Sequence, residues 1–222
     1  EAGHAIIGLT LEHANKVQKV TIIPRGNAGG YNLMTPKEET YLQTKSQLMA
    51  SITGYMGGRV AEEVFFGDVT SGAHNDIEQA TRIARLMVTE LGMSDLGPIK
   101  DASGQNAVVL GRDYSSQDNS HSGQIAFEID QQVRKIIDGC YAECKEIIEA
   151  QKDKLVTIAN ALLEHETLNN EQIESLYNTG VMLEMHDGKV DDTQDHQDIT
   201  FPDAPKTPDP VDLDDDLLDE MK

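Results

Sequence analysis

The sequence is poor in several residue types, and each shortage excludes a class of function. It has no Trp, 5% aromatic residues, and 18 Lys and Arg against 39 Asp and Glu, for a formal net charge of -21. Nucleic acids and anionic membrane surfaces bind cationic faces, so neither is an expected partner. No segment approaches the run of about 18 apolar residues that a membrane-spanning helix needs, so we expect this chain to be soluble. The two cysteines, Cys140 and Cys144, are too few for a disulfide framework and indicate a reducing compartment.

The acidic residues are concentrated near the C-terminal end. Residues 184–222 contain 14 Asp and Glu and 3 Lys, a net charge of -11, which leaves -10 for residues 1–183. The same segment holds four of the seven prolines and few apolar residues. Such a composition cannot bury enough apolar surface to fold. We therefore expect a folded domain over residues 1–183 and a disordered acidic tail over residues 184–222.

Hydrophobic spacing predicts a mainly α fold, a helical domain with a small β-sheet near its first helix. Apolar residues recur at helical spacing in six segments, at 1–13, 42–66, 71–91, 125–151, 155–166 and 171–178. One strand is expected at 16–24, a second within the Gly-rich stretch 25–34 and a third at 107–110. Ser71 is the expected N-cap of the third helix and Gly92 its C-cap.

The chain begins with E-A-G-H, which is the end of the H-E-x-x-H pattern of zinc peptidases. A His before Glu1 would lie on the same helix face as His4, so both imidazoles could bind one zinc ion. Glu1 could reach a metal-bound water, which is the position of a general base. That first His is absent from the sequence. Taken alone, a His beside an apolar helix face is interpreted as a packed or hydrogen-bonded residue.

A catalytic zinc ion needs a third protein ligand. The pattern H-E-x-x-H-x-x-G-x-x-H fails, because Ile7 and Thr10 occupy its Gly and third His places. In the helix after residue 70, Asp76 lies at the edge of the expected buried stripe, whereas Glu78 lies on a charged, exposed face. Asp76 could bind a metal or support the helix N-terminus, whose dipole favours anions, and spacing leaves both open. His74 lies on a different face and is expected to be exposed.

Two further segments have competing interpretations. Val20, Thr21 and Ile22 could form an edge strand to which an extended substrate adds through backbone hydrogen bonds. They could equally form a strand that only completes the sheet. Gly57 and Gly58 lie inside a predicted helix, where each costs about 1 kcal/mol relative to Ala. Their presence favours close packing against another backbone over a catalytic role.

The remaining polar and thiol groups favour structural interpretations. Arg59, Glu62 and Glu63 are expected to form an ion-paired helix face. Cys140 and Cys144 fall on the apolar stripe of the long helix and are expected to pack in the core.

Seven stretches, in their order along the chain, resemble the C-terminal peptidase domain of the FtsH family of ATP-dependent zinc metalloproteases. They are EAGHA, KVTIIPRGNAGGY, GGRVAEEVFFG, TSGAHNDIEQATRIARLMV, LGRDYS, IDQQVRKII and ALLEHETL, and they cover Glu1 to about Met182. The resemblance implies that His4 is a zinc ligand and Glu1 the general base. It also implies that Asp76 is the third zinc ligand. The first ligand His has no position in this sequence, so zinc affinity and turnover of this chain should be reduced.

The resemblance implies partners as well. Proteins of this family are membrane-anchored homo-hexamers, in which an AAA-type ATPase ring feeds unfolded proteins to the peptidase ring. This implies a peptidase domain on the cytoplasmic side of a bacterial cell membrane. ATP would bind the upstream domain, since no Walker P-loop occurs in this sequence.

We therefore expect a zinc endopeptidase domain that acts on unfolded protein chains. One alternative is a non-enzymatic helical oligomerisation module, a ring scaffold whose metal site is incomplete. A second alternative is a zinc peptidase whose third ligand is a Glu.

Overall fold

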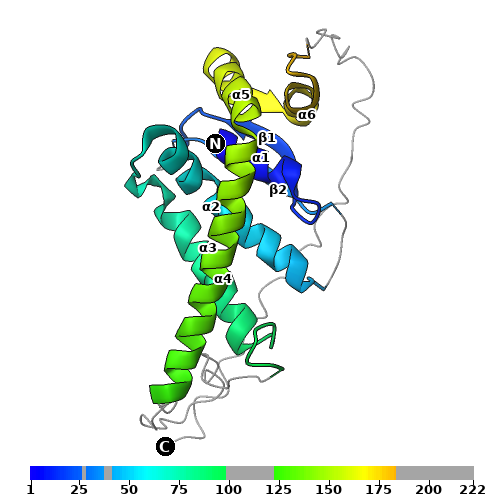
Figure 1. Ribbon diagram of the computed structural model, residues 1–222. Coiled ribbons are helices and arrows are strands. Elements are labelled where there is room, and N and C mark those ends of the chain that lie inside the picture. The colour runs from blue at the N-terminus through cyan, green and yellow to red at the C-terminus, as the bar shows by residue number, and fades with distance from the viewer. Residues whose placement is uncertain (27–28, 38–41, 99–122, 184–222) are drawn as a thin grey trace, which may run out of the picture. The chain divides into compact units, whose positions relative to one another are not determined.

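The computed structural model describes residues 1–26, 29–37, 42–98 and 123–183 (Figure 1). They form, in chain order, α1 (Ala2–Thr10), β1 (Lys16–Thr21), β2 (Tyr31–Thr35), α2 (Lys45–Phe66), the 3-10 helix η1 (Ser71–Ala73), α3 (His74–Thr89), α4 (Gly123–Ala150), α5 (Lys152–His165), β3 (Thr167–Asn169) and α6 (Asn170–Thr179). The expected mainly helical fold with a small sheet is confirmed. None of these described helices combines the length and the hydropathy that crossing a bilayer requires. The strand expected at 107–110 and the tail expected at 184–222 lie outside the described residues.

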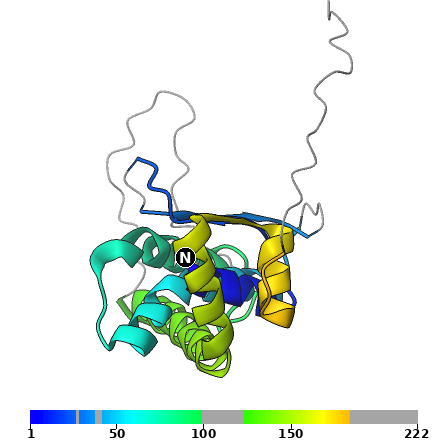
Figure 2. The same cartoon turned by 90° about the horizontal axis from the view of Figure 1, so that it is seen from above.

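The first helix, α1, lies at the centre of the domain. It contacts β1, α2, α4, α5 and α6, and its residues Ala5, Ile6 and Ile7 are wholly buried. Burying one Ile side chain contributes about 1.5–3 kcal/mol, so these contacts hold α1 firmly in the core. Figure 2 shows the sheet edge-on, with the helices on one of its faces. The residues at the start of α1 are therefore placed by a rigid scaffold.

The helices α1 and α2 cross at a pair of glycines. A Cβ atom on Gly3 would lie 2.3 Å from the carbonyl oxygen of Gly57, and one on Gly57 would lie 3.0 Å from the carbonyl of Gly3. Neither residue can carry a side chain without moving a backbone. The prediction of close packing against another backbone is confirmed for Gly57, whereas Gly58 lies against the side chain of His4.

The sheet has the strand order β2-β1-β3, so β1 is its central strand. Val20 and Thr21 pair with β2 on one side and with β3 on the other, both antiparallel. The backbone N–H of Ile22 donates to the carbonyl of Glu166 at 2.9 Å. The expectation that Val20, Thr21 and Ile22 form an edge strand open to substrate is therefore wrong. The sequence does not predict β3, because its three residues follow directly on a helical pattern.

Both predicted caps of the third helix are wrong. The side chain of Thr70, not that of Ser71, accepts a backbone hydrogen bond and caps a 3-10 turn that precedes α3. At the other end the C-cap is Glu90, two residues before Gly92. Gly92 has a φ of +60° and turns the chain just beyond the helix.

The predicted apolar stripes are largely correct. The stripe on α4 is buried or partly buried throughout, and it includes the wholly buried Cys140 and Cys144. Burial raises the pKa of both thiols, to about 12 for Cys144. Of the apolar residues predicted to form the stripe of residues 71–91, Ala80, Ala84, Met87 and Val88 are buried, whereas Ile77 and Leu91 are 40% and 44% exposed, and Leu91 lies beyond the end of α3.

Candidate metal and catalytic site

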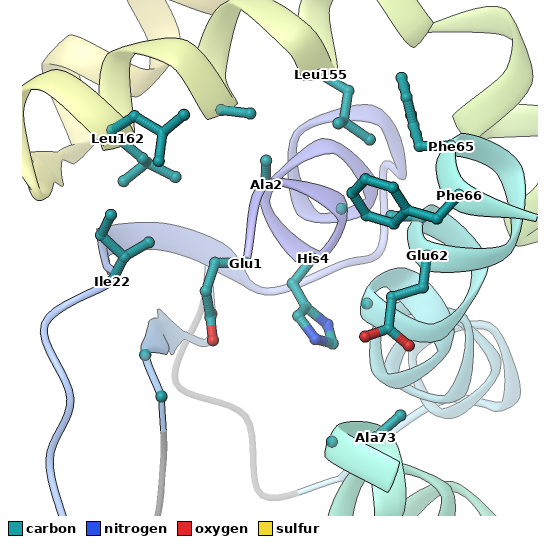
Figure 3. A pocket seen from close by; sticks show the side chains of 18 of the residues that line it. Glu1, Ala2, His4, Ile22, Glu62, Phe65, Phe66, Ala73, Leu155 and Leu162 are labelled. Carbon is teal, nitrogen blue, oxygen red and sulfur yellow. The ribbon is translucent and has the colours of Figure 1, made fainter. Parts of the chain in front are cut away.

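Two of the predicted metal ligands meet at the start of α1 and α3. The Nε2 atom of His4 lies 3.4 Å from an Oδ2 atom of Asp76. Their side chains are 16% and 26% exposed, so most of the surface of each is buried. Both line a cavity of about 650 Å³, together with Glu1 and Glu62. Figure 3 shows the His4 ring pointing into this cavity between Glu1 and Glu62.

The hydrogen bonding of His4 fixes which ring nitrogen faces Asp76. The Nδ1 atom lies 2.9 Å from the carbonyl oxygen of Gly54 on α2. A carbonyl only accepts, so Nδ1 carries the proton and, in the neutral ring, Nε2 presents a lone pair. This arrangement is typical of a metal-binding histidine, whose other nitrogen donates to a backbone carbonyl. The ring fits because Gly58 has no side chain: a Cβ atom there would lie 2.6 Å from Nε2.

The pair formed by His4 and Asp76 fits a zinc ion. A neutral imidazole nitrogen and a carboxylate oxygen are both acceptors, so a cation or a proton between them would stabilise their approach. Two ligand atoms at about 2.1 Å from a tetrahedral zinc ion are about 3.4 Å apart, and the two atoms here are 3.4 Å apart. Within the described part of the chain, no group of three or more His, Cys, Asp or Glu residues is arranged to hold a metal. A zinc ion held by His4 and Asp76 would need a further ligand.

The other carboxylate and imidazole candidates lie elsewhere. Glu78 and His74 are exposed on α3, whereas Asp76 faces His4 from the same helix. Asp76 also lies in the first turn of α3, where the helix dipole favours a negative charge. The two interpretations that spacing left open for Asp76 are therefore compatible.

Glu1 is fixed at the edge of the same cavity. The Nδ2 atom of Asn32 on β2 donates to the Glu1 carboxylate oxygen Oε2 and to the Glu1 carbonyl, the latter at 3.1 Å. The chain of Gly30 packs against the carboxylate, since a Cβ atom there would lie 3.0 Å from Oε1. Nothing in the sequence spacing pointed to Asn32, because its partner lies on a different secondary structure element.

Glu62 holds the turn before α3, a role that the sequence does not predict. Its carboxylate accepts hydrogen bonds from the backbone N–H of Thr70 at 3.0 Å and from its hydroxyl at 2.7 Å. Arg59 donates to the Thr70 carbonyl at 3.2 Å. The hydrogen bonds from the Thr70 backbone and side chain lower the pKa of Glu62, and the charge of Arg59 adds to this. The helix α2 thus fastens the turn that leads into α3 and so helps to place Asp76.

The prediction that Arg59, Glu62 and Glu63 form an ion-paired face of α2 is therefore wrong. Glu63 does not pair within its own helix but with Lys145 of α4, at 2.8 Å, and with the hydroxyl of Tyr141. Arg59 and Glu62 turn to the Thr70 segment instead. These contacts lie between elements, where spacing along one helix gives no information.

The wall of the cavity away from the polar groups is apolar. It is formed by one face of α5 and the end of α2, and includes Phe65, Phe66, Leu155, Val156, Leu162 and Leu163 (Figure 3). Phe66 and Leu163 are 80% and 74% exposed. The cavity therefore places an acidic and imidazole cluster beside a surface suited to apolar side chains.

Comparison with known proteins points to one family. The family model described as Peptidase family M41 matches residues 1–176. The ATP-dependent zinc metalloprotease FtsH of Bacillus subtilis (strain 168) is 51% identical over 199 residues, which are 87% of this chain and 31% of that protein. The protein of the same name from Alkalihalophilus pseudofirmus is 53% identical over 188 residues, 84% of this chain and 28% of that protein. The chain spans less than a third of the length of these curated relatives.

Proposed function

This chain belongs to peptidase family M41, and from that premise we propose that it works as the zinc-dependent endopeptidase domain of an ATP-dependent protease. The resemblance to FtsH proteins is confirmed by the family match and by relatives of that name. The metalloprotease class is confirmed by the same findings. The observation that carries the proposal further is the approach of His4 to Asp76 on the wall of the cavity.

We propose that His4 and Asp76 hold zinc together with an imidazole placed before Glu1. Bound zinc would supply Lewis-acid polarisation of the scissile carbonyl and would acidify the attacking water. Glu1 accepts the proton of that water at a carboxylate oxygen and delivers it to the leaving amine. The hydrogen bond from Nδ1 of His4 to the Gly54 carbonyl directs Nε2 at the cavity, and in the neutral ring that nitrogen carries the lone pair.

We propose that the substrate is an extended, unfolded protein chain. Because β1 is internal, β2 and β3 are the two edges of the sheet among the described strands, and we propose that such a chain adds to β2. Gly29 and Gly30, just before β2, line the cavity. A chain that adds to β2 would pass Glu1 and present its side chains to the apolar wall. Unfolded proteins expose the apolar side chains that this wall suits.

The partners proposed for the whole protein rest on the relatives. Their names describe ATP-dependent proteases, and no Walker P-loop occurs in this sequence. We propose that ATP binds an AAA-type ATPase domain of the same protein, and that the assembly is a membrane-anchored homo-hexamer. The peptidase domain would face the cytoplasm of a bacterial cell.

The test is the zinc content per chain, measured by elemental analysis on a version with one His placed before Glu1. We expect one zinc ion per chain, lost in Asp76→Ala and retained in the matched control Glu78→Ala. If zinc were instead retained in Asp76→Ala and lost in Glu78→Ala, the third ligand would be a Glu. No zinc in the His-completed chain would favour the helical ring-scaffold module instead.

A second variant separates metal binding from catalysis. Glu1→Gln should retain zinc but lower hydrolysis of an unfolded protein such as reduced casein by about 10²–10⁴-fold, the range for loss of a general base. Unchanged hydrolysis in this variant would exclude Glu1 as the general base.

A further inference from the structure

A side chain from the sheet holds the proposed general base. The Nδ2 group of Asn32 donates one hydrogen bond to the carbonyl of Glu1 and one to its carboxylate oxygen Oε2. We propose that Asn32 is a positioning residue, which orients the Glu1 carboxylate toward the attacking water. This inference rests on the proposed function, because it takes Glu1 as the base.

The orientation of the Asn32 amide follows from its partners. A carbonyl and an ionised carboxylate only accept, so the NH2 end must face Glu1 and uses both of its hydrogens there. The other end, Oδ1, is buried and has no hydrogen-bond partner among the described residues. An unpaired buried acceptor costs free energy. The Asn32 amide therefore donates both of its hydrogens to Glu1, although this leaves its own oxygen Oδ1 without a hydrogen bond from the described residues.

The two contacts leave one carboxylate oxygen of Glu1 for chemistry. Asn32 occupies Oε2, and the chain of Gly30 lies against the other side of the carboxylate. Among the described residues, Oε1 accepts no hydrogen bond. A glutamate side chain has three rotatable bonds, and these contacts restrict it before substrate arrives. The restriction is what a general base needs, since it must reach the water at hydrogen-bond distance.

The support for Asn32 is itself rigid. Asn32 pairs with Val20 of the central strand, and Val20 is wholly buried. The Glu1 carbonyl also accepts the N–H of Ala5, at 3.2 Å, so Asn32 is tied to the first turn of α1. A site held by strands and helices keeps its geometry better than one held by loops.

The chain contains a matched control. The Nδ2 group of Asn170 also donates to one backbone carbonyl, that of Val17, and to one carboxylate, that of Glu174, both at 2.8 Å. Asn170 does not line the cavity. Changes at Asn170 therefore report the loss of the same two kinds of hydrogen bond without a contact to Glu1.

The first experiment needs neither metal nor activity. The side-chain amide protons of asparagines in this chain are observed by 15N-resolved NMR. Glu1→Ala should shift the Asn32 amide protons and speed their exchange with water, and leave those of Asn170 unchanged. Glu174→Ala should do the reverse. Asn32 protons that do not respond to Glu1→Ala would overturn the inference.

The second experiment measures catalysis in the His-completed, zinc-loaded chain. Asn32→Leu keeps the shape but removes the donor, and we expect kcat to fall between about tenfold and about a hundredfold, as for a displaced catalytic group. KM and zinc per chain should not change. Asn32→Asp, which also places a charge beside Glu1, should lower kcat at least as much. Asn170→Leu should leave kcat unaltered.

The outcomes separate this inference from the proposed function. If the starting chain takes up zinc and cleaves protein but Asn32→Leu has the same kcat, the positioning role is refuted alone. Loss of zinc in Asn32→Leu would also refute it, because Asn32 would then support the metal ligands. If the starting chain neither binds zinc nor cleaves, the proposed function fails and Asn32 has no catalytic role, whatever the NMR result.

Discussion

Gly58 provides a test of the metal site, because one methyl group added there should weaken zinc binding and leave the fold intact. A Cβ atom on Gly58 would lie 2.6 Å from Nε2 of His4, whereas ordinary van der Waals contacts begin at 3.4 Å. The imidazole must therefore move by about 0.8 Å in Gly58→Ala. Zinc–ligand distances tolerate only about 0.2 Å. The displacement is several times larger than the site can accept.

The stability of Gly58→Ala should change little. Replacing a helical Gly by Ala stabilises by about 1 kcal/mol, and losing the hydrogen bond from His4 to Gly54 costs about 1 kcal/mol. The two terms offset each other, so the free energy of unfolding in urea should stay within about 1 kcal/mol of wild type. The zinc dissociation constant of the His-completed chain should rise at least about tenfold, the lower range for perturbed metal ligands.

Gly54→Ala is the matched control, four residues earlier on α2. A Cβ atom there meets nothing within 4 Å, and the carbonyl that accepts from His4 is kept. This variant should be more stable by about 1 kcal/mol and should bind zinc as wild type does. Competition titration with a chromogenic chelator gives both affinities. If Gly58→Ala bound zinc as tightly as the His-completed chain without this substitution, Nε2 of His4 would be refuted as a ligand.

Three further predictions concern the scaffold. The pKa of Glu62 is lowered in the folded protein, so its contribution to the free energy of unfolding is present above the ordinary pKa of the group and is lost as the pH falls through the folded value. Urea unfolding of wild type should therefore show an acid-side loss that Glu62→Gln lacks, and equal pH profiles would contradict this. Cys144, with its pKa raised to about 12, should react with iodoacetamide at pH 8 only after urea unfolding; rapid labelling of the native chain would show that the thiol is accessible. Gly3→Ala should destabilise by about 1–3 kcal/mol or more, because its Cβ atom meets the rigid carbonyl of Gly57 at 2.3 Å, and an unchanged midpoint of thermal unfolding would rule out this close crossing.

The sequence predicts the helices well, because the buried residues of each helix recur at helical spacing within one continuous segment. Spacing places Asp76 at the edge of the buried stripe of α3 but leaves two roles open for it, and the ligand role is implied only by the resemblance to the FtsH family. The strand β3 was missed because it is only three residues long and depends on Glu166, which has a φ of +59° and turns the chain away from α5. No local signal marks a non-glycine residue in that conformation. The error had a consequence, since it left β1 with an apparent free edge.

The polar supports of the site escaped prediction for a different reason. Asn32 and Glu62 each form hydrogen bonds with a residue outside their own element. Which residues meet in this way depends on how the elements pack, and the spacing along one segment does not show it. Gly58 was read as a packing residue, and it is one, but the atom it makes room for is the candidate metal-binding nitrogen of His4. The close crossing of α1 and α2 at Gly3 and Gly57 is what brings the ring to that position. Backbone contact between two helices thus fixes the imidazole, and the hydrogen bonds that Thr70, in the turn before α3, donates to Glu62 bring Asp76 toward it.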